Sequence, residues 1–278
     1  MMPSPEAIER YGRDGYLVLD GFVESARCDD LRARMATIID GFDPSQARTV
    51  FGSADQRHAD DAWFLDSGDK IRFFLEPDAL DGAGELRRPL ALAINKVGHA
   101  LHDLDPVFEA FSRGEHFARL AAALGLARPL LLQSMYIFKQ PGMGDEVTCH
   151  QDGTFLHTDP LSCVGLWLAL EDADLENGCL WVEPGGHRRP LHQRFVRAGR
   201  SCRMVTVHPD PLPVDGLAPL PVPQGTLVVL HGQLPHRSGS NRSPRSRHAY
   251  ALHLIDGVCR YSPDNWLQRS PEMPLRGF

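Results

Sequence analysis

Apolar residues in the first part of the chain recur at helical spacing. After Ser25, which we expect to cap a helix, they return every three or four residues until Gly41 ends the pattern. The same spacing runs over residues 107–124. The segment 51–103 between these two helices has little clear periodicity. We therefore predict a mostly helical N-terminal part that covers about residues 1–125.

From Pro129 onward the apolar residues form short runs of strand length, several of them with alternating faces. The predicted strands are 131–138, 163–170, 179–182, 226–231 and 247–254. Asn177-Gly178 is a strong turn signal between the second and the third of them, and we expect the proline-rich stretch 203–223 to be a long surface loop. Short strands between glycine and proline turns are typical of a β-sandwich or a jelly roll. We expect one domain over residues 1–278, mainly β with flanking helices, whose strand-rich core covers about 129–256.

Composition and charge argue against several classes of protein. The formal net charge of -7 argues against non-specific binding of nucleic acid. The longest apolar runs, such as 166–170, are too short to span a membrane, and the residues MMPSPEAIER lack the basic and apolar regions of a secretory signal. The cysteines form no C-x-x-C pair, which favours free thiols in a reducing compartment. We expect a cytoplasmic protein, and the sequence leaves its oligomeric state open.

The pattern His-x-Asp occurs four times, beginning at His58, His150, His157 and His208. Residues two apart in a strand point to the same side, so both side chains can reach one metal ion. With a histidine from a later strand, such a pair forms the set of two histidines and one carboxylate that leaves three positions open on a non-haem iron. Only His150 and Asp152 follow one strand-like run and precede another, so we predict that this pair binds the metal.

A third ligand is expected at the end of the strand 226–231 or just after it. His236 follows the turn after this strand, and Ser238 comes two residues later. His231, at the end of the strand itself, is an alternative. Arg247 lies eleven residues after His236. Its guanidinium can grip a carboxylate through two parallel hydrogen bonds, which is what the distal carboxylate of 2-oxoglutarate needs when its other end chelates iron.

Longer segments make this interpretation more specific. They are DGYLVLDGF at 14–22, SGDKIRFF at 67–74, INKVGHALHDLDPVF at 94–108, QSMYIFKQP at 133–141, HQD at 150–152, LENGCLWVEPGGH at 175–187, HGQLPHRS at 231–238 and DNWLQ at 264–268. On these segments the chain resembles the phytanoyl-CoA dioxygenase family, and within it the group named phytanoyl-CoA dioxygenase domain-containing protein 1. The likeness covers nearly the whole length, and the combined motifs are far more specific than His-x-Asp alone.

The resemblance implies a double-stranded β-helix, a jelly roll of the cupin type, as the core. It implies Fe(II) bound by His150, Asp152 and His236, with 2-oxoglutarate and O2 as co-substrates. The residues that correspond to the family's contacts with 2-oxoglutarate are Lys96, Met135, Trp167, Ser238 and Arg247. Met135 and Trp167 could equally be core residues that line the barrel.

The resulting hypothesis is a 2-oxoglutarate-dependent dioxygenase that hydroxylates a small-molecule or acyl substrate and releases succinate and CO2. A non-catalytic, cupin-like module that binds or senses the metal and 2-oxoglutarate is the alternative. The sequence does not identify the prime substrate. Residues 188–203 contain six arginines and no acidic residue, which favours an anionic substrate, although a solvated basic loop would have the same composition.

Overall fold

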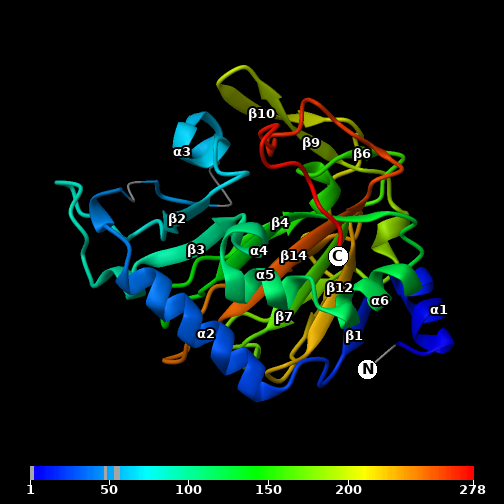
Figure 1. Cartoon of the computed structure of the whole chain (residues 1–278), viewed down its shortest axis with the longest axis horizontal. Coiled ribbons are helices and arrows are strands. Elements are labelled where there is room, and N and C mark those ends of the chain that lie inside the picture. Colours follow the sequence, from blue (N-terminus) through cyan, green and yellow to red (C-terminus); the bar gives the residue numbers. More distant parts are fainter. Residues whose placement is uncertain (1–2, 47–48, 53–56) are drawn as a thin grey trace.

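The computed structural model describes residues 3–46, 49–52 and 57–278, and its centre is a pair of antiparallel β-sheets (Figure 1). The larger sheet contains seven strands within this part of the chain. In spatial order they are β1 (Tyr16–Leu19), β12 (Leu227–His231), β7 (Val164–Ala169), β14 (Ala249–Asp256), β4 (Pro129–Ile137), β3 (Ile94–His99) and β2 (Ile71–Leu75).

The smaller sheet faces the central strands of the larger one. Its order is β11 (Ala218–Leu220), β8 (Leu180–Val182), β13 (His236–Ser238) and β5 (Val147–His150). Two further antiparallel pairs lie outside both sheets: β9 (Gln193–Ala198) with β10 (Ser201–Thr206), and β6 (Thr158–Asp159) with β15 (Arg260–Tyr261). Neighbours such as β12, β7, β14 and β4 come from distant parts of the chain, which is typical of a jelly roll.

Helices cover the outer face of the larger sheet. The helix α2 (Ser25–Asp40) runs across this face together with α5 (Pro106–Ser112) and α6 (Glu115–Ala123) (Figure 1). Leu31 of α2 and Phe108 of α5 are fully buried in one apolar cluster with Leu168 and Tyr250 of the sheet. Each such side chain contributes roughly 1.5–3 kcal/mol through burial, which fixes the outer face and leaves the inner face for a site. The remaining helices are α1 (Pro5–Asp14), α3 (Ala62–Leu65) and α4 (Leu101–Leu104).

The inner face of the larger sheet is turned toward the smaller sheet. Along β7, Leu166 and Leu168 belong to the helix-side cluster, whereas Trp167 and Ala169 belong to a second cluster that includes Leu180 of β8. This alternation is the one expected for a strand that is buried on both faces. The two faces predicted for residues 163–170 are therefore confirmed.

The N-terminal part is less helical than predicted. The strands β1, β2 and β3 lie within residues 1–125 and extend the larger sheet at both edges. The strand β3 is buried along most of its length, although it contains Lys96, Gly98 and His99. It therefore has neither the polar and apolar alternation of a half-buried strand nor a continuous apolar run, and its pairing with β4 decides its structure.

The helix predicted over 107–124 is in fact two helices. The helices α5 and α6 are separated at Gly114, whose φ of -60° and ψ of 144° are those of extended backbone. Glycine costs about 1 kcal/mol relative to alanine inside a helix, so a break is favoured at this residue. The helix predicted after Ser25 is confirmed, but Glu24 rather than Ser25 stands at the N-cap.

Residues 203–223 do not form one long loop. The strand β10 extends through Thr206, and β11 lies near the end of the segment. The turn at Gly178 is confirmed by its left-handed φ of 88°, but it connects strands that belong to different sheets. Arg247 lies two residues before β14 rather than at its first position.

The predicted fold class is confirmed: the protein is mainly β with flanking helices and has a jelly-roll core. All six cysteines are free thiols. Across the part of the chain that the structure describes, we find no helix with the length and apolar character needed to cross a bilayer.

Candidate metal centre

A cavity of about 260 Å³ lies between the two sheets. Side chains of residues that pair across neighbouring strands lie next to each other, so the strand register orders the cavity wall into rows. One row contains Gln133, Gly165 and His253, the next contains Met135, Trp167 and Ala251, and Ile137 contributes from the row that follows. The smaller sheet faces these rows with β5 and β13.

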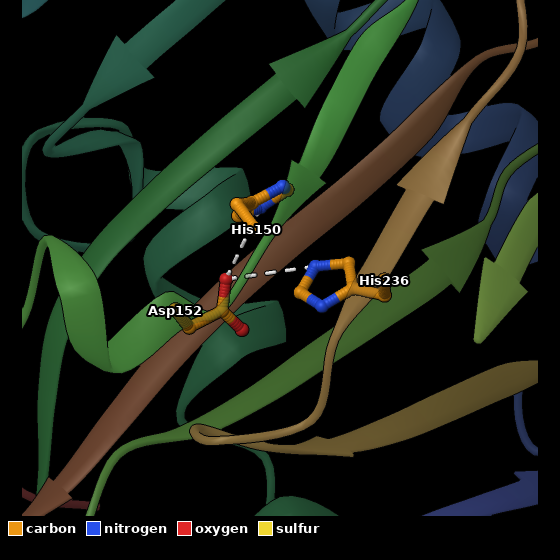
Figure 2. Close-up of side chains that lie close together, drawn as sticks. All are labelled: His150, Asp152 and His236. Carbon is orange, nitrogen blue, oxygen red and sulfur yellow. Dashed lines mark ion pairs between the residues drawn. The ribbon is translucent and has the colours of Figure 1, made fainter. Parts of the chain in front are cut away.

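His150, Asp152 and His236 converge beside the first of these rows (Figure 2). The register of β5 and β13 pairs His150 directly with His236, and Asp152 begins a short 3-10 turn just after β5. Nε2 of each histidine lies 3.6 Å from Oδ1 of Asp152, as the dashed lines in Figure 2 indicate. Donor atoms that are each about 2.1 Å from one ion lie about 3–3.5 Å apart, so a small contraction would bring all three onto a metal.

Both histidines have the tautomer that metal binding requires. Nδ1 of His150 lies 2.8 Å from the carbonyl oxygen of Thr148, and Nδ1 of His236 lies 3.0 Å from that of Leu234. A carbonyl oxygen can only accept, so Nδ1 of each ring donates, and Nε2 is the nitrogen left to bind a metal. Burial lowers the pKa of His236 to about 4, which keeps this ring neutral at neutral pH.

Asp152 is buried but ionised. Burial acts to raise the pKa of Asp152, but the imidazoles of His253 and His236 outweigh it and hold that pKa well below its usual value. The three residues therefore present two imidazole nitrogens and one carboxylate. This donor set suits a divalent metal ion of the non-haem iron type.

His253 is a residue of the site that we did not predict. Its Nε2 atom lies 3.3 Å from Oδ2 of Asp152, on the side away from the other two histidines. No motif marks it, but it lies six residues after Arg247 and hence on the same face of the predicted strand. That spacing is the only signal in the sequence that could have indicated it.

The other candidates for metal ligands lie elsewhere. His157 and His208 are not among the residues that line the cavity. The side chain of His58 lies outside the described residues. His231, the alternative third ligand, packs with its ring centroid 5.1 Å from that of His187. The structure thus brings together the three residues predicted as ligands, while iron binding itself stays a prediction.

Arg247 marks the other end of the cavity. It is 1% exposed, and its guanidinium lies over the ring of Trp167, 5.2 Å from the centroid. Its Nε and Nη1 atoms have no hydrogen-bond partner among the described residues. Burial lowers the pKa of Arg247 to about 10, so the group is still charged at neutral pH. A buried charge without a partner is costly, which indicates that this end of the cavity is suited to an anion.

The other residues predicted to contact 2-oxoglutarate line the same cavity. Met135 and Trp167 form its second row, and Ser238 projects from β13 on the same side as His236. Nζ of Lys96 lies 3.0 Å from the centroid of the Phe51 ring. Burial lowers the pKa of Lys96 well below its usual value. Contact with the co-substrate stays a prediction for all of them.

Segments outside the two sheets complete the cavity wall. Phe64 of α3 stacks on Trp266, which follows β15, with 4.3 Å between the centroids and 16° between the ring planes. Phe51, Met204 of β10 and Leu212 also contribute. Figure 1 shows α3, the β9–β10 pair and the C-terminal segment on one side of the sheets. We call this part of the wall the aromatic mouth, and its surface is largely apolar.

The arginines of residues 188–203 lie outside the cavity. Three of them have carboxylate partners: Arg189 with Glu183 at 2.8 Å, Arg194 with Asp264 at 2.6 Å, and Arg197 with Asp66 at 3.1 Å. The last two pairs tie β9 to neighbouring segments. Part of the basic cluster is thus explained by contacts within the protein.

A jelly roll whose inner cavity holds two histidines and one carboxylate defines a class of metalloproteins with open coordination positions. The model of the phytanoyl-CoA dioxygenase (PhyH) family matches residues 11–249. The chain belongs to this family.

Relatives from plants and animals match over nearly the full length. The chain is 48% identical over 273 residues to phytanoyl-CoA dioxygenase 1 of Oryza sativa subsp. japonica, covering 97% of this chain and 96% of that protein. It is 44% identical over 282 residues to phytanoyl-CoA dioxygenase domain-containing protein 1 of Bos taurus, covering 98% and 97%. The resemblance identified from the sequence motifs is confirmed.

Solved structures share the fold at low sequence identity. One is the non-heme alpha ketoglutarate dependent carbocyclase SnoK from nogalamycin biosynthesis, with a TM-score of 0.65, 20% identity, and coverage of 99% of this chain and 94% of that one. Another is EctD from S. alaskensis with 2-oxoglutarate and 5-hydroxyectoine, with a TM-score of 0.65, 18% identity, and coverage of 96% and 84%. At these identities the likeness establishes the fold alone.

Proposed function

We propose that the protein is an Fe(II)- and 2-oxoglutarate-dependent dioxygenase that hydroxylates a small organic substrate and releases succinate and CO2. One observation carries the proposal. A single cavity holds a buried donor set for a metal ion at one end and the guanidinium of Arg247 at the other, with Nε and Nη1 lacking hydrogen-bond partners among the described residues. Membership of the family and the fold shared with 2-oxoglutarate-dependent enzymes support it.

His150, Asp152 and His236 would hold the iron through Nε2, Oδ1 and Nε2. All three residues line the cavity, so a metal ion held by them would keep open positions for the co-substrates there. When bound, Fe(II) supplies the redox chemistry that couples O2 and the oxidative decarboxylation of 2-oxoglutarate to hydroxylation of a C–H bond. The contribution of the protein is to orient the reactants and to exclude competing reactions.

Arg247 would pair with the distal carboxylate of 2-oxoglutarate. Its free Nε and Nη1 atoms point to a charge-assisted pair that no residue of the described chain supplies. The hydroxyl of Ser238 can donate a further hydrogen bond, and Met135 and Trp167 provide apolar contacts for the methylene groups. Lys96 lines the same cavity and would supply a further hydrogen-bond donor.

The prime substrate would enter at the aromatic mouth. Phe64 and Trp266 present ring surfaces there, and such an apolar wall would limit the access of water to the reacting centre. Among the described residues that line the cavity, Asp152 is the one carboxylate, and it belongs to the metal donor set, so a cationic substrate would find no further acidic partner among them. A small organic molecule or an acyl chain fits such a wall better.

Succinate formation tests the proposal directly. Purified protein is incubated with Fe(II), ascorbate, 2-oxoglutarate and a panel of metabolites in air, and succinate is measured. The wild type should release succinate, and His150→Ala should reduce the release at least about 100-fold, because removal of one ligand leaves too few donors to fix the ion. His157→Ala is the matched control, since this histidine belongs to a His-x-Asp pair outside the cavity, and it should retain activity.

Two other outcomes would be informative. Binding of metal and 2-oxoglutarate without succinate formation across the panel would favour the alternative, a non-catalytic binding or sensing module. The expectation of an anionic substrate is tested in the same panel by comparing carboxylates with their neutral amides. Preference for the amides would contradict that expectation.

A further inference from the structure

Asp152 turns only one of its carboxylate oxygens toward the ligand histidines. Oδ1 lies 3.6 Å from Nε2 of both His150 and His236. Oδ2 is directed at the larger sheet, where Nε2 of His253 lies 3.3 Å away, just beyond the usual range for a hydrogen bond. This buried oxygen has no formed hydrogen bond among the described residues, and Nε2 of His253 is the donor that a small shift would bring into range. Its surroundings on the larger sheet therefore decide how the carboxylate is oriented.

Gly165 leaves the space that Oδ2 occupies. The register of β7 and β14 places Gly165 directly opposite His253. A Cβ atom at Gly165 would lie 2.7 Å from Oδ2 of Asp152, closer than such atoms come in real structures. A side chain at this position would displace the Asp152 carboxylate, either toward the metal or away from His253.

Gln133 fixes the direction of the contact from His253. Nε2 of the Gln133 side chain lies 3.3 Å from Nδ1 of His253. An amide nitrogen can only donate, so Nδ1 accepts and Nε2 of the imidazole carries the proton. His253 then donates toward Oδ2. The reverse tautomer would set a lone pair of Nε2 against an ionised carboxylate. The favourable arrangement is therefore the one in which Gln133 donates to His253 and His253 donates toward Asp152.

We propose that His253, oriented by Gln133 and facing Gly165, is a positioning residue that keeps Oδ2 of Asp152 off the metal. The carboxylate then binds through Oδ1 alone. Carboxylates can bind a cation through one or both oxygens, and a second bond would occupy a position that the co-substrates need. The inference rests on the proposed metal centre and adds to it the residues that set the number of open positions.

The test measures metal binding rather than turnover. Mn(II) affinity is followed by electron paramagnetic resonance, and the Co(II) absorption spectrum reports the coordination number. His253→Leu should weaken Mn(II) binding about 10- to 100-fold, the usual effect of removing a partner of a metal ligand, and should change the Co(II) spectrum. His253→Gln, whose amide can donate to Oδ2, should restore most of the affinity. Gly165→Ala should also weaken binding, because it displaces the same oxygen.

Two comparisons separate positioning from a general effect on the fold. His248→Leu removes a histidine just before β14 whose Nδ1 lies 2.9 Å from Oη of Tyr136, and it should leave Mn(II) affinity unchanged. The double variant of His253→Leu and Gly165→Ala should have nearly the same Mn(II) affinity as whichever single variant binds Mn(II) less tightly, because both changes act on one carboxylate. Urea unfolding of the metal-free proteins shows whether each loss of affinity exceeds the loss of stability.

The proposal is overturned if His253→Leu leaves both the Mn(II) affinity and the Co(II) spectrum unchanged. It is equally overturned if His253→Gln fails to restore binding and the loss follows the unfolding free energy. A wild-type protein that binds neither ion would remove the metal centre itself, and this inference with it. Wild-type binding together with an unaffected His253→Leu variant removes only the positioning role.

Discussion

Replacing Arg247 by methionine should stabilise the protein in the absence of 2-oxoglutarate and weaken its binding of 2-oxoglutarate. The guanidinium is buried, and its Nε and Nη1 atoms lack hydrogen-bond partners among the described residues. Methionine is similar in length and uncharged, and its sulfur can pack on the ring of Trp167, where the guanidinium now lies 5.2 Å from the centroid. The change removes an uncompensated buried charge without opening a large cavity.

The variant should gain stability without 2-oxoglutarate and lose affinity for it. Replacing buried charged groups by apolar residues of similar volume has stabilised proteins by about 1–4 kcal/mol. Each kcal/mol corresponds to about 2–4 °C in the unfolding midpoint of a domain near this size, so we expect an increase of several degrees. Loss of a charge-assisted pair with a carboxylate costs about 2–5 kcal/mol. At 1.4 kcal/mol per tenfold change, the dissociation constant of 2-oxoglutarate should rise about 30- to 4,000-fold.

Thermal unfolding with Mn(II), in the presence and absence of 2-oxoglutarate, measures both effects, and calorimetric titration gives the affinity. The matched control is Arg197→Met, because Arg197 bonds to the carbonyl oxygen of Leu65 at 3.0 Å and lies outside the cavity. This control should keep the wild-type response to 2-oxoglutarate. A less stable Arg247→Met variant would show that the guanidinium has structural partners. An unchanged affinity would place the anchor elsewhere, with Lys96 as the first alternative.

Two further predictions concern buried carboxylates. Burial raises the pKa of Glu76 from 4.5 to about 7. The contribution of the protonated Glu76 carboxyl to the free energy of unfolding is therefore fully present below pH 4.5 and is lost as the pH rises through about 7. Glu76→Gln should therefore become more stable than the wild type above pH 7, by at most about 3 kcal/mol in urea unfolding, and a difference that stays constant from pH 5 to 8 would contradict this. Asp103 is buried among three arginines, including Arg269 at 2.9 Å, so Asp103→Ala should lose about 3–5 kcal/mol of unfolding free energy. Asp159→Ala, which breaks an exposed pair, should change stability little, and equal losses in the two variants would refute the argument.

The metal donor set could be predicted because its spacing is local. His150 ends one strand and Asp152 follows it two residues later, and His236 follows the turn after another strand. Such spacings are visible in a sequence. His253 becomes a neighbour of Asp152 only through the register of β14 against β7, which is a property of the assembled sheet.

The N-terminal half of the chain was harder to predict for the same reason. The strands β1 and β3 are formed by pairing with β12 and β4, which come much later in the chain. Their own residues show little of the alternation of apolar and polar positions that predicts a strand. The helix α2, in contrast, needs only its own apolar stripe and was predicted within one residue.

The aromatic mouth and the metal centre are built from different parts of the chain. Phe64, Met204 and Trp266 belong to α3, to β10 and to the segment after β15, whereas the donor set comes from the smaller sheet and the turn that follows it. Surface segments accept replacement far more readily than the strands that support them. Natural divergence or laboratory recombination can therefore exchange the mouth while the reaction centre is inherited unchanged. A chimera that carries a relative's three mouth segments on these sheets should acquire that relative's choice of substrate.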